Sequence, residues 1–134
     1  MLVIDASVAA RWFVPSLAWP GAKAILESGE SFIAPEIILV EVANAFWKAV
    51  RADYMTSQEM ATAIGHLPSL FTDLVPVREL VSDAGDLAVT LDHPVYDRCY
   101  IALARRVEAL LVTADKRLAQ PAQRVSGLEV RLIG

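Results

Sequence analysis

Two aspartates of this chain each come just after a short apolar run that reads as a buried strand. Asp5 follows Leu2–Ile4, and Asp115 lies just past the end of Leu110–Thr113 and before a short turn. Runs this short, apolar and branched are typical of buried parallel strands. Ligands of an open parallel sheet bind in the crevice outside the carboxyl ends of its strands. The two aspartates are therefore expected at one edge of one sheet.

Two further acids lie on predicted helices, at positions where an acid that merely faces solvent is not expected. Asp97 lies in the first turn of the helix predicted over Tyr96–Val107, and Glu41 lies within the helix predicted from Glu36 to Ala52. At 100° per residue Asp97 projects beside Tyr100, away from the arginines of its helix. Glu41 is expected in the middle of its helix, where capping cannot explain it.

Each acid also has a purely structural explanation when it is taken singly. The three aspartates can be helix caps or first-turn acids, and Glu41 can pair with Lys48 or Asn44 on a narrow polar side. Together they suggest more, because ionised carboxylates about 5 Å apart repel by roughly 3 kcal/mol per pair at an effective dielectric near 20. Such a cluster must bind protons or cations. Hard oxygen ligands suit Mg²⁺ or Mn²⁺, and the chemistry that follows is hydrolytic phosphoryl transfer.

Other motifs that carry chemistry are missing from the sequence. It has no GxxxxGK[ST] phosphate loop, no GxGxxG, no HExxH and no paired cysteine motif. His66 and His93 are expected at helix ends or in loops, and Cys99 in the core. Ser7 and Thr113 each lie two residues from an aspartate, where a hydroxyl can bind water or a carboxylate, or cap a helix. The three tryptophans could stack on bases or pack in the core or against a second subunit, and packing is favoured. They are Trp12, Trp19 and Trp47.

The composition is typical of a compact globular protein. The 134 residues suffice for one domain, 1–134, with 55% apolar and 21% charged residues. A net charge of −4 argues against a general nucleic-acid-binding surface, although bound cations can reverse the sign of an acidic site. The single cysteine suits a reducing cytoplasm. No apolar run is long enough for a membrane span, and no basic n-region of a signal peptide follows Met1.

Strands alternate with helices along the chain, which predicts an α/β fold. We expect a three-layer α/β/α sandwich with a central, mostly parallel sheet of about five strands. The predicted strands are Leu2–Ile4, Ser31–Ala34, Leu74–Val77, Leu110–Thr113 and Val130–Ile133. The predicted helices are Ala6–Phe13 (stopped by Pro15), Trp19–Glu27 (preceded by Ser16), Glu36–Ala52 (opened by Pro35), a helix capped by Thr56 or Ser57 and ending near Pro68, Glu79–Leu91, Tyr96–Val107 and a short one near the C-terminus.

The helix Glu36–Ala52 has an unusually wide apolar surface. Its polar residues gather on one narrow side; they are Glu41, Asn44, Lys48 and Arg51. An apolar surface so wide implies burial on more than one side. Contact with a second subunit is one way to achieve it.

Four segments of the sequence together resemble the PIN-domain nucleases. They are MLVIDASVAARWF, APEIILVEVANAFWKAV, VYDRCYIALARR and LLVTADKRL, in the order and at the spacing of the family. The resemblance spans essentially the whole chain. The compact one-domain format is similar to that of VapC toxins, which belong to type II toxin–antitoxin pairs.

The resemblance implies a site, an activity and partners. Asp5, Glu41, Asp97 and Asp115 match the four acids of the family's metal site, and Ser7, Asn44 and Thr113 match supporting positions. It implies an endoribonuclease dependent on Mg²⁺ or Mn²⁺, a homodimer, and inhibition by a VapB-type antitoxin. Some relatives carry a further acid two residues past the fourth, where this chain has Arg117. The number of metals therefore stays open, and Arg117 with Lys116 becomes a candidate contact for a substrate phosphate.

Two other functions compete with the nuclease. A non-catalytic PIN-like module would keep the acids but bind a partner, which suits the wide apolar helix surface. A phosphoacceptor domain of receiver type also gathers aspartates around Mg²⁺. It needs an acceptor aspartate at the end of a mid-sheet strand, and neither Ser31–Ala34 nor Leu74–Val77 ends in an acid.

Overall fold

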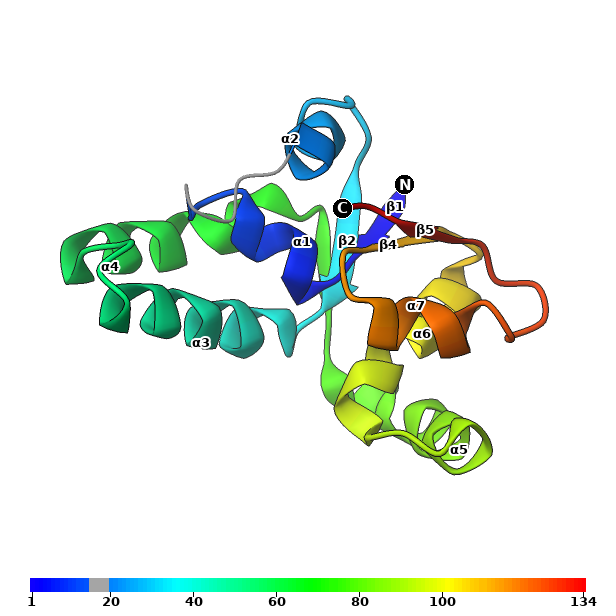
Figure 1. Ribbon diagram of the computed structural model, residues 1–134. Helices are drawn as coiled ribbons and strands as arrows, with labels where there is room; N and C mark the ends of the chain where they lie inside the picture. The colour runs from blue at the N-terminus through cyan, green and yellow to red at the C-terminus, as the bar shows by residue number, and fades with distance from the viewer. Residues whose placement is uncertain (15–19) are drawn as a thin grey trace.

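A five-stranded parallel sheet lies at the centre of the computed structural model, which describes residues 1–14 and 20–134 (Figure 1). The strand order is β3-β2-β1-β4-β5, and every neighbouring pair is parallel. The strands are β1 (Leu2–Ile4), β2 (Phe32–Pro35), β3 (Asp73–Val75), β4 (Leu110–Thr113) and β5 (Val130–Leu132). All residues of β1 and β2 are buried, because helices cover both faces of the sheet, and their continuous apolar runs follow from this.

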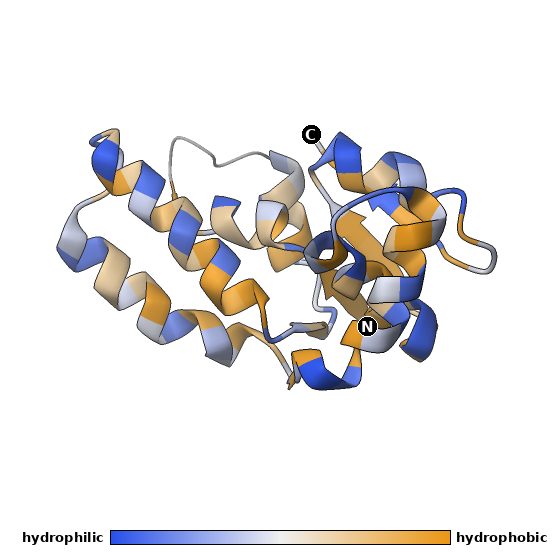
Figure 2. Cartoon of the chain, turned by 90° about the horizontal axis from the view of Figure 1, so that it is seen from below, coloured by the Kyte–Doolittle hydropathy of each residue, from blue (hydrophilic) through white to orange (hydrophobic). Residues whose placement is uncertain are grey.

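The helices form the two outer layers of the predicted α/β/α sandwich. They are α1 (Ala6–Arg11), α2 (Pro20–Leu26), α3 (Ile38–Arg51), α4 (Ser57–His66), α5 (Val81–Leu91), α6 (Val95–Val107) and α7 (Lys116–Ala122), with short 3₁₀ turns η2 (Leu67–Leu70) and η3 (Val77–Glu79). Right-handed crossovers place α1 to α4 on one face and α5 to α7 on the other. Helix α6 packs on β1, β2 and β4. Figure 2 shows the apolar strands enclosed by helices of mixed polarity.

Several predicted element ends are corrected by the structure. Helix α1 ends at Arg11 instead of Phe13, and the predicted roles of Pro15, Ser16 and Trp19 fall outside the described residues. Strand β3 ends at Val75, because Pro76 and the 3₁₀ turn Val77–Glu79 follow it. Helix α5 consequently begins at Val81, two residues later than predicted.

The start of α3 differs from the prediction in a way that affects the site. Pro35 is the last residue of β2 and does not open the helix, which begins at Ile38. Glu41 therefore lies in the first turn of α3, and the prediction of a mid-helix position was wrong. Its side chain forms no cap there, since the N-cap residue is Ile37 and no side chain caps this end.

The apolar surface of α3 is only partly covered within this chain. Ile38, Val42, Phe46 and Ala49 are buried, whereas Val40 is 71% and Trp47 46% exposed. Among the described residues, no helix combines the length and apolar character that crossing a bilayer requires.

Candidate active site

Asp5 and Asp115 flank the point where the order of strands reverses. From β1 the chain proceeds to β2 and β3 on one side, and the later strands β4 and β5 lie on the other side. Ligand sites of open parallel sheets form at this switch point, outside the carboxyl ends of the strands. Asp5 directly follows β1, and Asp115 comes two residues after β4. The structure thus brings both aspartates to the predicted edge.

Asp5 is a helix cap and a buried acid at once. Its side chain is 4% exposed overall and accepts a hydrogen bond from the Val8 backbone N–H at the start of α1. The Ser7 hydroxyl donates to Oδ1 at 2.6 Å, and the Thr113 hydroxyl donates to Oδ2 at 2.6 Å. Asp5 is therefore the helix cap that its position allowed, and it is buried as well.

Ser7 and Thr113 join the ends of β1 and β4. Besides donating to Asp5, the Ser7 hydroxyl accepts from the Ala114 backbone N–H at 2.9 Å. The fully buried Thr113 hydroxyl accepts from the Asp115 backbone N–H at 3.0 Å. The two hydroxyls thus orient the Asp5 carboxylate and hold the segment that carries Asp115.

Burial shifts the protonation of Asp5. Loss of water contact raises its pKa to about 6, and the charge of Asp115 adds to the rise. The hydrogen bonds from Ser7, Thr113 and Val8 act in the opposite direction. Because no basic side chain contributes to this balance, Asp5 is a carboxylate that a nearby cation would stabilise.

Glu41 is half-buried and bonded to a residue of another helix. The Tyr100 hydroxyl of α6 donates to Glu41 Oε1 at 2.6 Å. Burial raises the pKa of Glu41, the Tyr100 hydrogen bond lowers it, and the charges of Asp97 and Asp5 raise it further. The alternative pairing with Lys48 or Asn44 is not what this structure shows.

Asp97 faces the same negative surroundings from α6. Burial raises its pKa, the neighbouring Arg98 lowers it, and Asp115 raises it. Arg117 and His93 also lower it, by smaller amounts. Asp97 therefore lies between acids and a few cations, partly shielded from water.

Asp115 caps the last helix and is paired with an exposed arginine. Its Oδ1 accepts from the Arg117 backbone N–H at 2.8 Å and lies 3.5 Å from Arg117 Nε. The Arg117 side chain is 89% exposed, and Lys116 beside it is exposed too. Both contacts are made by Oδ1.

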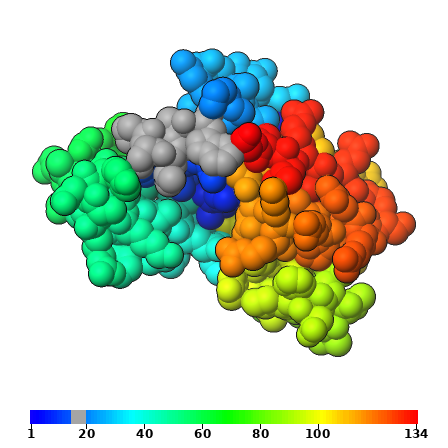
Figure 3. All heavy atoms as spheres, in the orientation of Figure 1, coloured from blue at the N-terminus to red at the C-terminus, as the bar shows by residue number. Residues whose placement is uncertain are grey.

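The four acids form one electrostatically coupled group. Asp5 interacts with Asp115, Glu41 with Asp97 and Asp5, and Asp97 with Asp115. Within the described residues, however, no group of three or more His, Cys, Asp and Glu side chains is arranged so that it could hold a metal ion. In the space-filling view, residues of α1 are visible between α3 and α7 (Figure 3), so these helices leave part of α1 uncovered.

Two residues of this region were not among the predicted site residues. Tyr100 lies three positions after Asp97, on the same helix face; helical periodicity placed it beside Asp97 but assigned it no role. Arg98 is fully buried, and its guanidinium nitrogens make no hydrogen bond in the described part of the chain. Nothing in the local pattern signals a buried arginine, because charged side chains are rarely buried without partners.

The remaining candidate residues mostly lie where the sequence predicts. His66 ends α4, His93 precedes α6, and Cys99 is buried. Trp12 packs against Phe32 and Phe71, whereas Trp47 is exposed beneath the Arg51 guanidinium. Trp19 lies outside the described residues.

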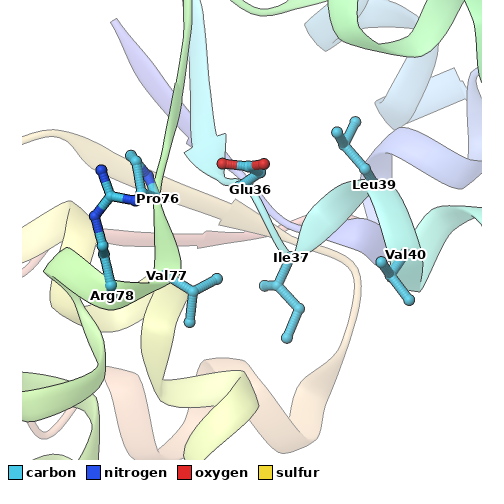
Figure 4. Close-up of a pocket in the computed structure, with 7 residues that line it drawn as sticks. All are labelled: Glu36, Ile37, Leu39, Val40, Pro76, Val77 and Arg78. Atoms are coloured by element: carbon cyan, nitrogen blue, oxygen red, sulfur yellow. The ribbon is translucent and has the colours of Figure 1, made fainter.

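A groove of about 430 Å³ lies at the carboxyl ends of β2 and β3, beside the start of α3 (Figure 4). Its lining is apolar apart from two charged side chains; the residues are Glu36, Ile37, Leu39, Val40, Pro76, Val77 and Arg78. Glu36 directly follows β2, so an acid does come after that strand, but it is exposed and lies outside the coupled group.

Comparison with known proteins identifies the family. The PIN domain profile matches residues 2–123. The chain belongs to the PIN domain family. This PIN domain is 31% identical to Ribonuclease VapC3 of Pyrobaculum aerophilum over 121 residues, which cover 89% of this chain and 92% of the relative. It is 33% identical to Ribonuclease VapC1 of Mycobacterium tuberculosis over 123 residues, covering 87% of both chains.

Solved structures agree on the fold. VapBC2 from Rickettsia felis, bound to a DNA fragment from its promoter, superposes with a TM-score of 0.72 at 13% identity, covering 99% of this chain and 98% of the other. FitAcB from Neisseria gonorrhoeae superposes with a TM-score of 0.64 at 17% identity, covering 97% and 96%. The resemblance and the predicted fold class are thereby confirmed.

Proposed function

We propose that this PIN domain is a divalent-metal-dependent endoribonuclease that hydrolyses RNA phosphodiester bonds at Asp5, Glu41, Asp97 and Asp115. One observation carries the proposal: four carboxylates from four segments interact at the switch point of the sheet, and burial raises the pKa of three of them. A bound cation would relieve this repulsion. The VapC ribonucleases among the relatives support RNA as the substrate class.

The donor set fits Mg²⁺ or Mn²⁺. All four side chains offer hard carboxylate oxygens, the ligands that these ions prefer. Asp5, Asp97, Asp115 and Glu41 would hold the ion. Among the described residues, no three His, Cys, Asp or Glu side chains lie where they could hold a metal ion, so these acids would have to move closer together when the ion binds.

The chain's own residues prepare the site for hydrolysis. Ser7 and Thr113 orient the Asp5 carboxylate, and we infer a supporting role for Asn44, which is exposed on α3 one turn beyond Glu41. When bound, the ion supplies a polarised phosphoryl oxygen and a more acidic water molecule. The exposed Lys116 and Arg117 can contact a substrate phosphate next to Asp115.

The biological role follows from the same relatives. We infer that the protein is the toxin of a VapBC-type pair, acts on RNA in the cytoplasm, forms a homodimer and is inhibited by a VapB-type antitoxin. The VapC names and the VapBC2 complex support this inference. A neighbouring open reading frame for a small DNA-binding protein would identify the antitoxin.

RNA cleavage by purified protein tests the activity. We expect cleavage that needs Mg²⁺ or Mn²⁺ and stops with EDTA. Asp97→Asn should lower the rate on the order of a hundredfold, the scale seen when one group that stabilises transition-state charge is lost. Asp86→Asn is the matched control, because Asp86 is exposed on α5 and outside the coupled group.

Equal rates for wild type and Asp97→Asn would refute the role given to this acid. Tight partner binding without metal-stimulated cleavage of any RNA would favour the non-catalytic binding module instead.

A further inference from the structure

Tyr100 contacts segments that carry the acids from the opposite side of the sheet. Its side chain is 1% exposed, and its hydroxyl donates to Glu41 Oε1 at 2.6 Å, 59 positions away in sequence. The backbone of Ala6, next to Asp5, also lowers the pKa of the Tyr100 phenol through a hydrogen bond. Tyr100 lies on α6 three residues after Asp97. One phenol therefore links α6, α3 and the start of α1.

Core packing alone does not account for this contact. A buried phenol needs a hydrogen-bond partner, but backbone carbonyls usually meet that need. Here the acceptor is a half-buried carboxylate that feels the charges of Asp97 and Asp5. A hydrogen bond to a charged acceptor is shorter and stronger than one between neutral groups, and the 2.6 Å distance is short.

The contact also fixes a flexible side chain. A glutamate that is not held loses substantial rotamer freedom when it must adopt one conformation. The Tyr100 hydroxyl holds Oε1, and Oε2 has no hydrogen bond in the described part of the chain. Burial keeps the pKa of Tyr100 well above its usual value, so the hydroxyl remains a donor.

We propose that Tyr100 is a positioning residue of the metal site, which holds Glu41 Oε1 so that Oε2 is presented to a divalent cation. This inference rests on the proposed function, because it assigns a role within the same site. Residues that hydrogen-bond to metal ligands typically contribute 10- to 100-fold to metal affinity.

Direct Mn²⁺ binding to the RNA-free protein tests the proposal. Tyr100→Phe removes only the hydroxyl, and we expect the Mn²⁺ Kd to rise about tenfold by calorimetry. Tyr54→Phe is the matched control, because Tyr54 is 61% exposed and away from the acids; its Kd should match the wild type. Unchanged or tighter binding by Tyr100→Phe overturns the proposal.

A double-mutant cycle separates positioning from general stability. If Tyr100 acts through Glu41, adding Tyr100→Phe to Glu41→Gln should change the Kd no further. An additional tenfold loss in that background would mean that Tyr100 acts by another route, and would overturn the proposal.

A measurement on the unmutated chain avoids any folding defect of the variant. With ¹³Cζ-labelled tyrosine, the Tyr100 resonance should shift when Mg²⁺ is added to wild type and stay in place in Glu41→Gln. The exposed Tyr54 and Tyr96 are assigned by their phenylalanine variants. If the Tyr100 resonance does not shift when Mg²⁺ binds, this proposal is overturned but the proposed nuclease activity is not. If the wild type binds no divalent ion, both proposals are overturned.

Discussion

At the scale of a single residue, two effects act in opposite directions on the ionisation of Asp5. Capping α1 favours the negative carboxylate, because the helix N-terminus carries positive partial charge. Burial disfavours the same charge and raises the pKa to about 6 from 3.8. Between these values the folded state binds more protons than the unfolded state, so this group makes the metal-free protein less stable as pH rises from about 4 to 6.

Asp5→Asn should stabilise the metal-free protein at pH 8. At pH 8 the raised pKa of Asp5 lowers the free energy of unfolding of the wild type by about 3 kcal/mol. Asparagine removes this cost, but one of the hydrogen bonds to the side chain must change direction, which reduces the gain by about 1 kcal/mol. We expect the free energy of unfolding to increase by about 2 kcal/mol. Asparagine caps helices as well as aspartate does. Urea unfolding in EDTA measures the effect.

The pH dependence provides the internal control for Asp5→Asn. Near pH 4 both the wild-type carboxyl and the amide are neutral, so the gain should disappear. A variant that is less stable than wild type at both pH values would show that burial does not oppose ionisation of Asp5.

At the scale of elements, local signals suffice where an element depends on local interactions. Helix α4 buries only Ala63, and Thr56 with Glu59 forms a complete capping box at its start. The sequence predicted this start correctly. The start of α3 was predicted wrongly, because proline suits a first helical position and also a strand end, where Pro35 lies next to Val75 of β3.

Thr56→Ala should cost about 1 kcal/mol of stability, the usual value of an N-cap side chain. Glu59 keeps its bond to the Thr56 backbone N–H, so the loss concerns one hydrogen bond. Thermal unfolding measures it, and Mn²⁺ affinity should stay unchanged. Thr62→Ala, at an exposed position within α4, is the control and should not destabilise. Equal stability of Thr56→Ala and wild type would contradict the cap's contribution.

At the scale of the whole molecule, a bound cation would act as part of the fold. The coupled acids come from α1, α3, α6 and the start of α7, on both faces of the sheet. Any ion that binds only the folded chain stabilises all of these segments together.

Saturating Mn²⁺ or Mg²⁺ should therefore raise the unfolding temperature. A free concentration of about 100 times Kd corresponds to about 2.7 kcal/mol. The shift should be larger at pH 8 than at pH 5.5, because the pKa of about 6 leaves Asp5 largely protonated at the lower pH. The raised pKa values of Glu41 and Asp97 act in the same direction. Differential scanning calorimetry measures it. An equal shift for Asp97→Asn would place the ion elsewhere.

The sequence by itself determined the sheet and the shared edge of the acids. The apolar runs of β1 and β4 were predicted with their observed ends, because strands covered on both faces must be apolar throughout. Asp5 and Asp115 then had to meet, since parallel strands end at the same edge. The helix that carries Asp97 followed from its periodicity.

Only the tertiary structure decided how the acids are held. It paired Glu41 with Tyr100 across 59 positions, buried Arg98, and removed water from Asp5. These features depend on which distant side chains meet and on how much solvent they exclude. Hydrophobic periodicity reports which face of an element is buried, but it carries no information on the partner that a polar group finds there or on the resulting desolvation.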